Sequence, residues 1–285
     1  MIKSKKLFYL FLGLLLLNLV LWSIIIERVF FKEKIVFLDI GQGDSEIIIN
    51  KGGNILIDAG SKKVVEKIEK ELPLFEKTID IFILSHPDRD HFLGIFDILE
   101  RYKIRAIILK DLSKSDSLYH QFLEEIKKRK ILVLVPKESL KIHWLKKDNV
   151  LVFSTEKLKQ KSTSQHSLIA LYQFKNFNIL FTGDIDQYLE KQLIPILQKI
   201  VKKIDILKVA HHGSKNSSSK EFLEAFKPLY AVIETGFNNY GHPHQEAIDR
   251  LKGVGSFIFR TDLDGSIVFL EKNNQLIYFL KKDKI

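Results

Sequence analysis

The chain has 285 residues, of which 46% are hydrophobic and 28% are charged, and its formal net charge is +10. This length suits one large α/β domain with an appendage, or two modest domains. Cysteine is absent, which excludes a disulfide framework, a thiolate metal site and a cysteine nucleophile. Any metal must therefore be held by His, Asp or Glu. The positive charge favours polyanionic partners, although lysines spread over solvated faces would give the same total.

The N-terminal segment has the length and composition of a membrane span. Residues 7–26 form an apolar run preceded by three lysines. A helix rises about 1.5 Å per residue, so this run covers about 30 Å, the thickness of the hydrocarbon core of a bilayer. A cleaved signal peptide is the rival interpretation, but no small-residue cleavage site follows. A buried core helix is the other alternative.

We therefore expect a single-pass protein of the cell membrane. Residues 1–31 would be the anchor, with residues 7–26 in the lipid bilayer, and residues 32–285 would form one domain. Basic residues are balanced across the span, so the positive-inside rule gives no orientation. The free α-amino group favours a cytoplasmic N-terminus and an extracytoplasmic domain.

Short apolar runs and helical periodicity alternate through the first half of the domain. Strands are expected over residues 35–39, 46–49, 54–57, 79–84, 106–109, 131–135 and 150–154. Helices are expected over residues 62–72, 92–102 and 117–130.

The second half repeats this order. Strands are expected over residues 167–174, 178–181, 205–210, 230–234, 257–260 and 266–271, and helices over residues 187–201, 220–226 and 244–252. In each half a hairpin is followed by an acidic residue, Asp58 in the first and Asp184 in the second. Hairpins and β-α units in two similar halves predict an α/β fold, a four-layer αββα sandwich.

The strongest chemical signal directly follows an apolar strand. It is the segment Ser85-His86-Pro87-Asp88-Arg89-Asp90-His91. His86 and Asp88 could bind one ion while Asp90 and His91 bind another. Two ions about 3.5–4 Å apart can clamp a phosphate and activate water between them. A solvated turn whose aspartate caps the next helix is the alternative, but it accounts for only one of these residues.

This segment resembles the His-x-His-x-Asp-His signature of the metallo-β-lactamase-fold hydrolases, with Asp88 in place of the second histidine. That variant is typical of the ComEC-type competence protein family. The resemblance covers about residues 35–270, and its motifs, taken together and in the family's order, are specific to the family. Six further segments are similar to the same family: Leu38-Asp39-Ile40-Gly41-Gln42-Gly43-Asp44-Ser45, Ile57-Asp58-Ala59-Gly60, Thr182-Gly183-Asp184, His211-His212-Gly213-Ser214, Tyr240-Gly241-His242-Pro243-His244 and Arg260-Thr261-Asp262-Leu263-Asp264-Gly265.

The resemblance implies roles for residues outside the ligand loop. Asp58 is expected to orient that loop, and Asp184 to bridge both ions through its two carboxylate oxygens. His212 is the preferred late ligand of the second ion, with His211 as the alternative ligand or as a contact to substrate. His166 precedes Asp184 at a spacing that suits a ligand of the first ion, although the ComEC-type pattern commonly has Asn there.

Two other motifs carry weaker signals. His242 lies in a loop that opens a helix, where it could donate a proton to the leaving oxygen or contact the phosphate; helix capping is the alternative. Gly41-Gln42-Gly43 lacks a third glycine and precedes a strand, which excludes a dinucleotide-binding loop. No organic cofactor is expected. Thr261, Asp262 and Asp264 lie at a predicted turn, and His120 and His143 lie outside every motif.

The resemblance implies an extracytoplasmic, metal-dependent hydrolase with two divalent ions, Mn²⁺ or Zn²⁺. Its substrate would be a phosphodiester, with DNA or a cell-wall polyanion as candidates. With a single candidate span, the chain is not expected to transport DNA by itself. The alternatives are a teichoic-acid or phosphocholine esterase, a lactone or lactam hydrolase, and a non-catalytic, membrane-tethered binding module. The expected ligands are His86, Asp88, Asp90, His91, His166, Asp184 and His212, and the expected catalytic residues are Asp184, Asp90, His242 and His211.

Overall fold

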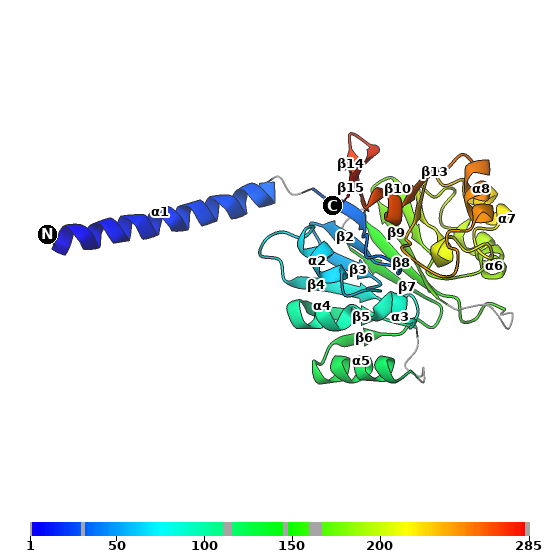
Figure 1. Ribbon diagram of the computed structural model, residues 1–285, viewed down its shortest axis with the longest axis horizontal. Coiled ribbons are helices and arrows are strands. Elements are labelled where there is room, and N and C mark those ends of the chain that lie inside the picture. Colours follow the sequence, from blue (N-terminus) through cyan, green and yellow to red (C-terminus); the bar gives the residue numbers. More distant parts are fainter. Residues whose placement is uncertain (1, 30–31, 111–115, 145–147, 160–166, 283–285) are drawn as a thin grey trace. The chain divides into compact units, whose positions relative to one another are not determined.

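The computed structural model describes residues 2–29, 32–110, 116–144, 148–159 and 167–282. The chain divides into two compact units, Met1–Glu33 and Lys34–Ile285. The first unit consists of helix α1 (Ile2–Val29), drawn in dark blue in Figure 1. Within α1, the window Lys5–Trp22 has a mean hydropathy of 1.7 and no buried residue. Length and composition therefore make α1 a candidate membrane span.

The second unit contains two mixed β-sheets (Figure 1). The eight-stranded sheet has the order β15-β14-β1-β2-β3-β4-β5-β6. Its strands are β1 (Lys34–Phe37), β2 (Glu46–Asn50), β3 (Gly53–Ile57), β4 (Thr78–Ile83), β5 (Lys103–Ile108), β6 (Leu132–Leu134), β14 (Ser266–Lys272) and β15 (Gln275–Lys281).

The seven-stranded sheet has the order β13-β12-β11-β10-β9-β8-β7. Its strands are β7 (Ser139–His143), β8 (Asn149–Ser154), β9 (Leu168–Phe174), β10 (Phe177–Phe181), β11 (Ile206–Lys208), β12 (Tyr230–Ile233) and β13 (Phe257–Arg260).

The two sheets repeat one pattern, as the sequence predicts. An antiparallel hairpin, β2 with β3, continues into the parallel strands β4, β5 and β6. In the second sheet the hairpin β9 with β10 continues into the parallel strands β11, β12 and β13. Parallel strands present their carboxyl ends at one edge of a sheet, so each half supplies several loops to the same side.

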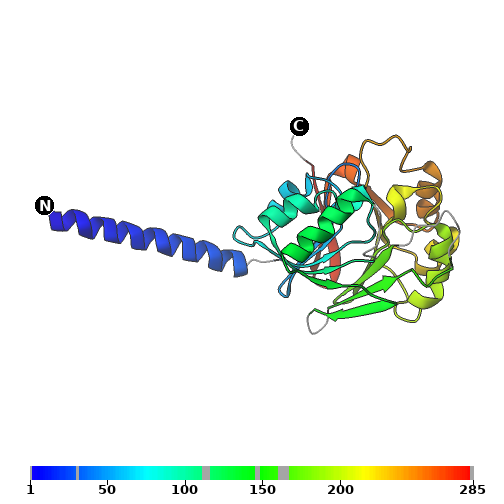
Figure 2. The same ribbon diagram turned by 90° about the horizontal axis from the view of Figure 1, so that it is seen from below.

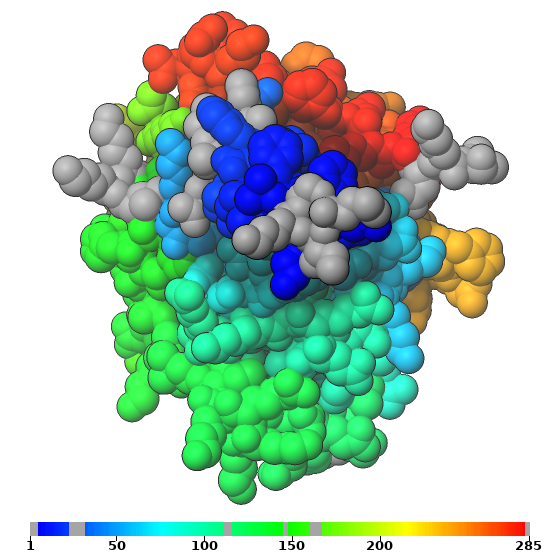
Figure 3. All heavy atoms as spheres, turned by 90° about the vertical axis from the view of Figure 1, so that its left-hand side faces the viewer, coloured from blue at the N-terminus to red at the C-terminus, as the bar shows by residue number. Residues whose placement is uncertain are grey.

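Helices cover the outer face of each sheet (Figures 1 and 2). On the eight-stranded sheet, Phe82 of β4 contacts Phe122 of α5 with ring centroids 6.4 Å apart. On the other sheet, one hydrophobic cluster joins β-strand residues to α6 and α7. Figure 3 shows the teal to green surface formed by the region of α4 and α5. The helices are α2 (Val64–Glu69), α3 (Arg89–Phe92), α4 (Ile95–Arg101), α5 (Ser117–Lys128), α6 (Gln187–Leu197), α7 (Lys220–Phe226), α8 (Gln245–Gly253) and α9 (Thr261–Asp264).

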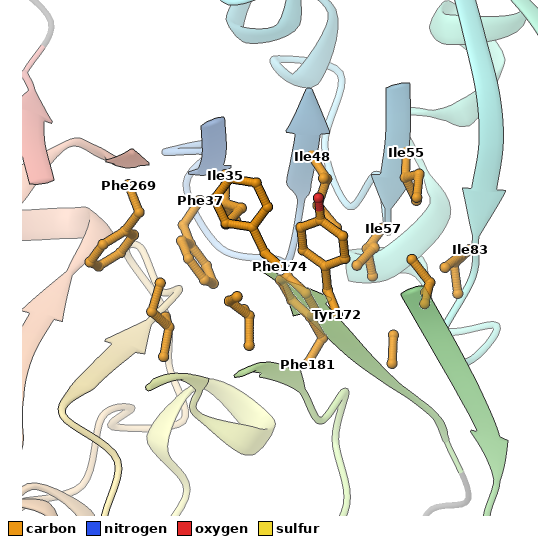
Figure 4. Packing of buried hydrophobic residues seen from close by; sticks show 14 of the residues in the cluster. Ile35, Phe37, Ile48, Ile55, Ile57, Ile83, Tyr172, Phe174, Phe181 and Phe269 are labelled. Atoms are coloured by element: carbon orange, nitrogen blue, oxygen red, sulfur yellow. The ribbon is translucent and has the colours of Figure 1, made fainter. Parts of the chain in front are cut away.

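The hydrophobic core lies between the two sheets (Figure 4). Alternate residues of each strand point into it, as the two-residue period of a strand requires. Ile55 and Ile57 of β3 belong to this cluster, and so do Tyr172 and Phe174 of β9. Phe181 of β10 stacks on a phenylalanine of β1 at a centroid distance of 5.8 Å. Burying each such side chain contributes about 1.5–3 kcal/mol.

Several predicted elements differ from the structure. The helix expected over residues 92–102 is broken into α3 and α4, because Gly94 donates its N–H to the Ala59 carbonyl at 2.7 Å. A side chain there would meet the Ser61 carbonyl oxygen at 2.2 Å. Strands β7 and β15 were not predicted. In β7, Ser, Lys and His leave only two apolar residues, whereas β15 does contain an apolar run, residues 276–280, that no predicted strand covers. The strand expected over residues 205–210 ends at Lys208, and a 3-10 turn, Ala210–Gly213, follows it.

Candidate metal centre

The candidate site lies where the carboxyl ends of the parallel strands meet. Asp58 follows β3, the segment Ser85–His91 follows β4, Asp184 follows β10, and the two adjacent histidines follow β11. These strands belong to both sheets. The fold therefore brings together residues that are more than a hundred positions apart in the chain, such as Asp90 and His212.

One group of ligand-type atoms comes from His86, His91 and Asp184, which lie within 4.8 Å of one another and are all buried. The two imidazole rings lie with their centroids 3.9 Å apart. His91 Nε2 is 3.5 Å from Asp184 Oδ1, and His86 Nε2 is 3.8 Å from Asp184 Oδ2. The Asp184 carboxylate thus offers a separate oxygen to each histidine.

A second group consists of Asp90, His91 and His212. His212 Nε2 lies 3.3 Å from Asp90 Oδ2, and the rings of His91 and His212 have centroids 5.7 Å apart. His91 belongs to both groups. Two adjacent ions, one in each group, would both lie beside the His91 ring, whose free nitrogen, Nε2, can ligate only one of them.

The hydrogen bonds leave one nitrogen of each buried histidine directed at these groups. The Nδ1 atoms are engaged: His86 with Ser85 Oγ at 3.0 Å, His91 with Asp58 Oδ2 at 2.7 Å, and His212 with the Glu234 carbonyl at 2.9 Å. Within the described residues, His86 Nε2, His91 Nε2 and Asp184 Oδ1 are buried without a hydrogen-bond partner. Buried polar atoms normally have partners, so these three fit a bound cation.

Asp58 organises the ligand loop. Its carboxylate accepts hydrogen bonds from the backbone N–H of Ser85 at 2.7 Å and from Ser85 Oγ at 2.6 Å. Its other contact is His91 Nδ1. A carboxylate bound to the far nitrogen of a ligating imidazole fixes the tautomer and the ring orientation. Asp58 is therefore placed to orient the loop and touches neither Asp184 nor His212 through any hydrogen bond between described residues.

Glycines let neighbouring loops approach the ligand loop closely. A Cβ at Gly60 would lie 1.8 Å from the Asp90 carbonyl oxygen, and one at Gly43 would lie 2.5 Å from the same atom. The Asp44 N–H donates to this carbonyl at 3.0 Å. Gly43 and Gly60, from two sequence motifs, thus allow close packing around Asp90.

The two adjacent histidines have left-handed backbone conformations, with φ of 50° at His211 and 51° at His212. Non-glycine residues rarely adopt these angles, and such strain concentrates at functional sites. The conformation turns the two side chains apart: His212 is buried, while the His211 side chain is 41% exposed. His211 Nε2 still lies 3.8 Å from Asp184 Oδ2.

His242 lies beside this pair, with its ring centroid 5.3 Å from that of His211 and 6.2 Å from that of His212. Asn238 holds its backbone on both sides, accepting from the His242 N–H and donating to the His242 carbonyl. Burial and the neighbouring His211 and His212 lower the pKa of His242 to about 4. The imidazole is therefore neutral at neutral pH.

Charge governs the ionisation of the buried ligands. Burial opposes charge on His212, but the Asp44 and Asp184 carboxylates raise its pKa to about 10. Burial also opposes charge on His91, but the nearby carboxylates, Asp184 first among them, raise its pKa. Burial and the adjacent His91 lower the pKa of His86 to about 3. A cation must therefore displace protons from His91 and His212 when it binds.

The remaining predicted residues lie in different settings. Asp88 has a side chain that is 40% exposed, with Oδ2 3.7 Å from His86 Nε2, and it stands outside both groups of three. His166 lies outside the described residues. Asp262 forms an ion pair with Arg260 at 2.6 Å, which supports leaving this motif off the list of ligands. His120 and His143 are exposed.

Sequence reasoning missed two charged residues under the site, Asp44 and Lys208. Both side chains are buried, and they form an ion pair with each other. Asp44 Oδ1 lies 3.1 Å from His212 Nδ1, and Asp44 Oδ2 lies 3.6 Å from His91 Nδ1. The signal was a lysine inside an otherwise apolar strand, which is rare unless the charge has a partner.

Comparisons with known proteins agree with this geometry. A profile of the metallo-beta-lactamase superfamily matches residues 38–236. ComE operon protein 3 of Bacillus subtilis is 30% identical over 264 residues, covering 83% of this chain and 33% of that protein. Recombination protein 2 of Haemophilus influenzae is 28% identical over 240 residues, covering 81% of this chain and 28% of that protein. The chain thus spans about a third of the length of these relatives.

A solved structure extends the likeness to the fold. The metallo-beta-lactamase fold protein YhfI of Bacillus subtilis has a TM-score of 0.58 and 14% identity, covering 83% of this chain and 99% of that one. The expected sandwich and the resemblance to ComEC-type competence proteins are both confirmed. The match over most of the second unit shows that this chain belongs to the metallo-beta-lactamase superfamily.

Proposed function

We propose that the chain is a two-metal hydrolase of phosphodiester bonds, with its substrate among DNA and other polyanions. The carrying observation is the set of three buried, unpartnered atoms on His86, His91 and Asp184, flanked by the Asp90–His212 pair. Two divalent ions held by these residues would activate water and neutralise charge on the phosphoryl oxygens. The competence relatives and the net charge of +10 support a polyanionic substrate.

We assign the ligands by these contacts. His86, His91 and Asp184 line one position, with Asp88 and His166 as further candidate ligands of that ion; Asp90, His91 and His212 line the other. Asp184 would bridge the two ions, because one of its oxygens lies 3.8 Å from His86 Nε2 and the other lies 3.5 Å from Nε2 of His91, which belongs to both groups. Asp58 positions the ligand loop through Ser85 and His91.

His211 and His242 would divide the remaining work. With a pKa lowered to about 4, His242 is neutral at neutral pH and suits a hydrogen bond to the phosphate. A group that has already lost its proton cannot act as the general acid. We therefore assign protonation of the leaving oxygen to His211, whose side chain is 41% exposed and whose Nε2 lies 3.8 Å from Asp184 Oδ2.

The substrate class is tested by comparing two reporters with the purified full-length chain, stripped of metal and then reconstituted. Turnover of bis-p-nitrophenyl phosphate, with no turnover of a chromogenic lactam, is the expected result. The Asp184→Asn variant serves as the control for contaminating phosphodiesterase. Lactam turnover without phosphodiester turnover would contradict the proposal, and absence of both would favour a non-catalytic binding module.

We also propose that residues 1–31 anchor the enzyme in the cell membrane and that the domain from residue 32 lies outside the cytoplasm. The apolar window Lys5–Trp22 supports the anchor. Carbonate extraction should leave the full chain in the membrane pellet, and release into the supernatant would contradict anchoring. Protease added to intact cells should cleave the domain if it is extracytoplasmic.

A further inference from the structure

A third group of ligand-type atoms lies beneath the two groups described above. It comes from Asp44, Asp58 and His91, whose ligand atoms lie within 4.8 Å of one another, all buried. Its composition, two carboxylates and an imidazole, is of the kind that binds divalent ions, and His91 Nδ1 is hydrogen-bonded there to Asp58 Oδ2 at 2.7 Å. The described part of the chain therefore presents three clusters of metal-ligand type, whereas the proposed reaction needs only two ions.

The third cluster differs from the others in having a cation supplied by the chain itself. Lys208 Nζ forms an ion pair with Asp44 Oδ2, the same oxygen that faces His91 Nδ1 at 3.6 Å. The Lys208 side chain is 1% exposed. It extends from β11, which lies between β10 and β12 inside the seven-stranded sheet, and the Lys208 carbonyl accepts from Thr182 Oγ1 at 2.7 Å. The side chain is thus paired with Asp44, and the backbone that carries it is held by Thr182.

The buried Asp44 carboxylate requires the Lys208 ammonium as a partner for its charge. An ionised carboxylate that is fully buried is costly unless it is paired. Burial raises the pKa of the nearby Glu46 to about 8 and raises that of Glu234 well above its usual value. Asp44 has the buried Lys208 ammonium as its ion-pair partner.

We propose that Lys208 is a built-in third cation: its ammonium takes the Asp44 oxygen that would complete a third metal position, and so limits the centre to two ions. Because the ammonium is covalently part of β11, it is neither lost nor exchanged. The Asp44 carboxylate can then remain under His91 and His212 without collecting a metal ion. This inference rests on the proposed metal centre but not on the identity of the substrate.

The test counts ions in the purified full-length chain, by equilibrium dialysis against Mn²⁺ followed by mass spectrometry. Lys208→Met removes the ammonium and keeps most of the apolar volume. Relative to the unaltered protein, we expect about one additional ion per chain and a larger increase of Tm on adding Mn²⁺, because an extra ion bound only by the folded state stabilises it. Neither readout depends on catalysis.

Two further variants make the comparison specific. Lys208→Met combined with Asp44→Asn removes both charges, and its ion count should return to that of the unaltered protein. Lys203→Met removes a lysine of the segment that precedes β11, whose side chain is 65% exposed, and its ion count should not change. If Lys208→Met folds only with Mn²⁺ while the double variant folds without it, the proposal is supported.

An unchanged ion count together with an unchanged Tm response in Lys208→Met would overturn the proposal. Failure of Lys208→Met to fold at any Mn²⁺ concentration, beside a folded double variant, would also overturn it, since a divalent ion then cannot replace the ammonium. The ion count and the Tm response are compared between variants and do not depend on turnover. Failure of this proposal can therefore be distinguished from failure of the hydrolase proposal, which the turnover assay tests.

Discussion

The space between the two sheets and the edge where their loops meet are both buried, yet they are built differently. Between the sheets, isoleucine, phenylalanine and tyrosine side chains interlock, and many residues share the same task (Figure 4). At the edge, aspartates, histidines and a lysine are buried side by side, each with specific polar partners. The hydrophobic interior is redundant, whereas the polar edge depends on individual contacts.

Removing Asp184 should have the largest effect on activity and little effect on folding. Asp184→Ala deletes the carboxylate that faces both His86 and His91. Loss of a metal-activated nucleophile is expected to lower kcat by about 10³-fold or more. His91→Ala should behave similarly, because both ligand groups include His91. Turnover and circular dichroism are the measurements, and near-normal turnover in both variants would refute the two-metal mechanism.

A cavity in the hydrophobic core should lower the stability of the protein and have little effect on its activity. Phe181→Ala leaves a cavity where the ring stacks on Phe37, and truncation of a buried phenylalanine costs about 3–5 kcal/mol. Chemical denaturation should show this loss of stability, while kcat of the folded fraction stays within about threefold, since the ligands lie at the edge. A large fall in kcat with unchanged stability would show that the two regions are not separable.

Asp58 tests whether the edge depends on single contacts. Asp58→Asn keeps the shape but weakens the bonds to Ser85 and His91. Loss of such an outer partner typically lowers metal affinity by about 10–100-fold. Competition with a chromophoric chelator measures the affinity. An affinity equal to that of the unaltered protein would show that Asp58 does not position the loop.

The charges at the edge predict how the metal-free protein responds to pH. His212 has a folded pKa of about 10 against an ordinary value of 6.5. Its stabilising contribution is therefore complete below about pH 6.5 and is lost as the pH rises towards 10. Glu46, with a pKa raised to about 8, acts with the same sign.

The Tm of metal-stripped protein should accordingly fall between neutral pH and about pH 10. Metal affinity should rise over the same range, because binding releases protons from His91 and His212. Thermal scans with and without Mn²⁺ measure both trends. A Tm of the stripped protein that is constant or rises with pH would contradict this assignment of charges.

The smallest expected effect concerns metal preference. Asp88 replaces the histidine usual in the family signature, and carboxylate ligands suit Mn²⁺ better than imidazole does. Mn²⁺ should therefore support faster cleavage than Zn²⁺, and Asp88→His should shift the preference towards Zn²⁺. Because Asp88 is partly exposed, we expect a change of only about tenfold in the ratio of rates. Faster cleavage with Zn²⁺, unaltered by the substitution, would exclude selection by Asp88.

Sequence patterns predicted the interior and the ligand loop but not the residues beneath the loop. Short apolar runs predicted β1 to β6 and β8 to β14 apart from their ends. The spacing of His86, Asp88, Asp90 and His91 predicted a metal site from neighbouring residues alone. Lys208 and Asp44 could not be paired, because they are 164 positions apart and meet only when the sheets stack. The kink at Gly94 likewise depends on a tertiary hydrogen bond to Ala59.

The most direct test of the central claim is a titration of metal-stripped, full-length protein with Mn²⁺ while bis-p-nitrophenyl phosphate turnover is followed. The two ligand groups around His91 predict that activity rises to a maximum at two ions per chain and that Asp184→Ala stays inactive throughout. Full activity at one ion per chain, or no activity at any Mn²⁺ concentration, would contradict a two-metal phosphodiesterase.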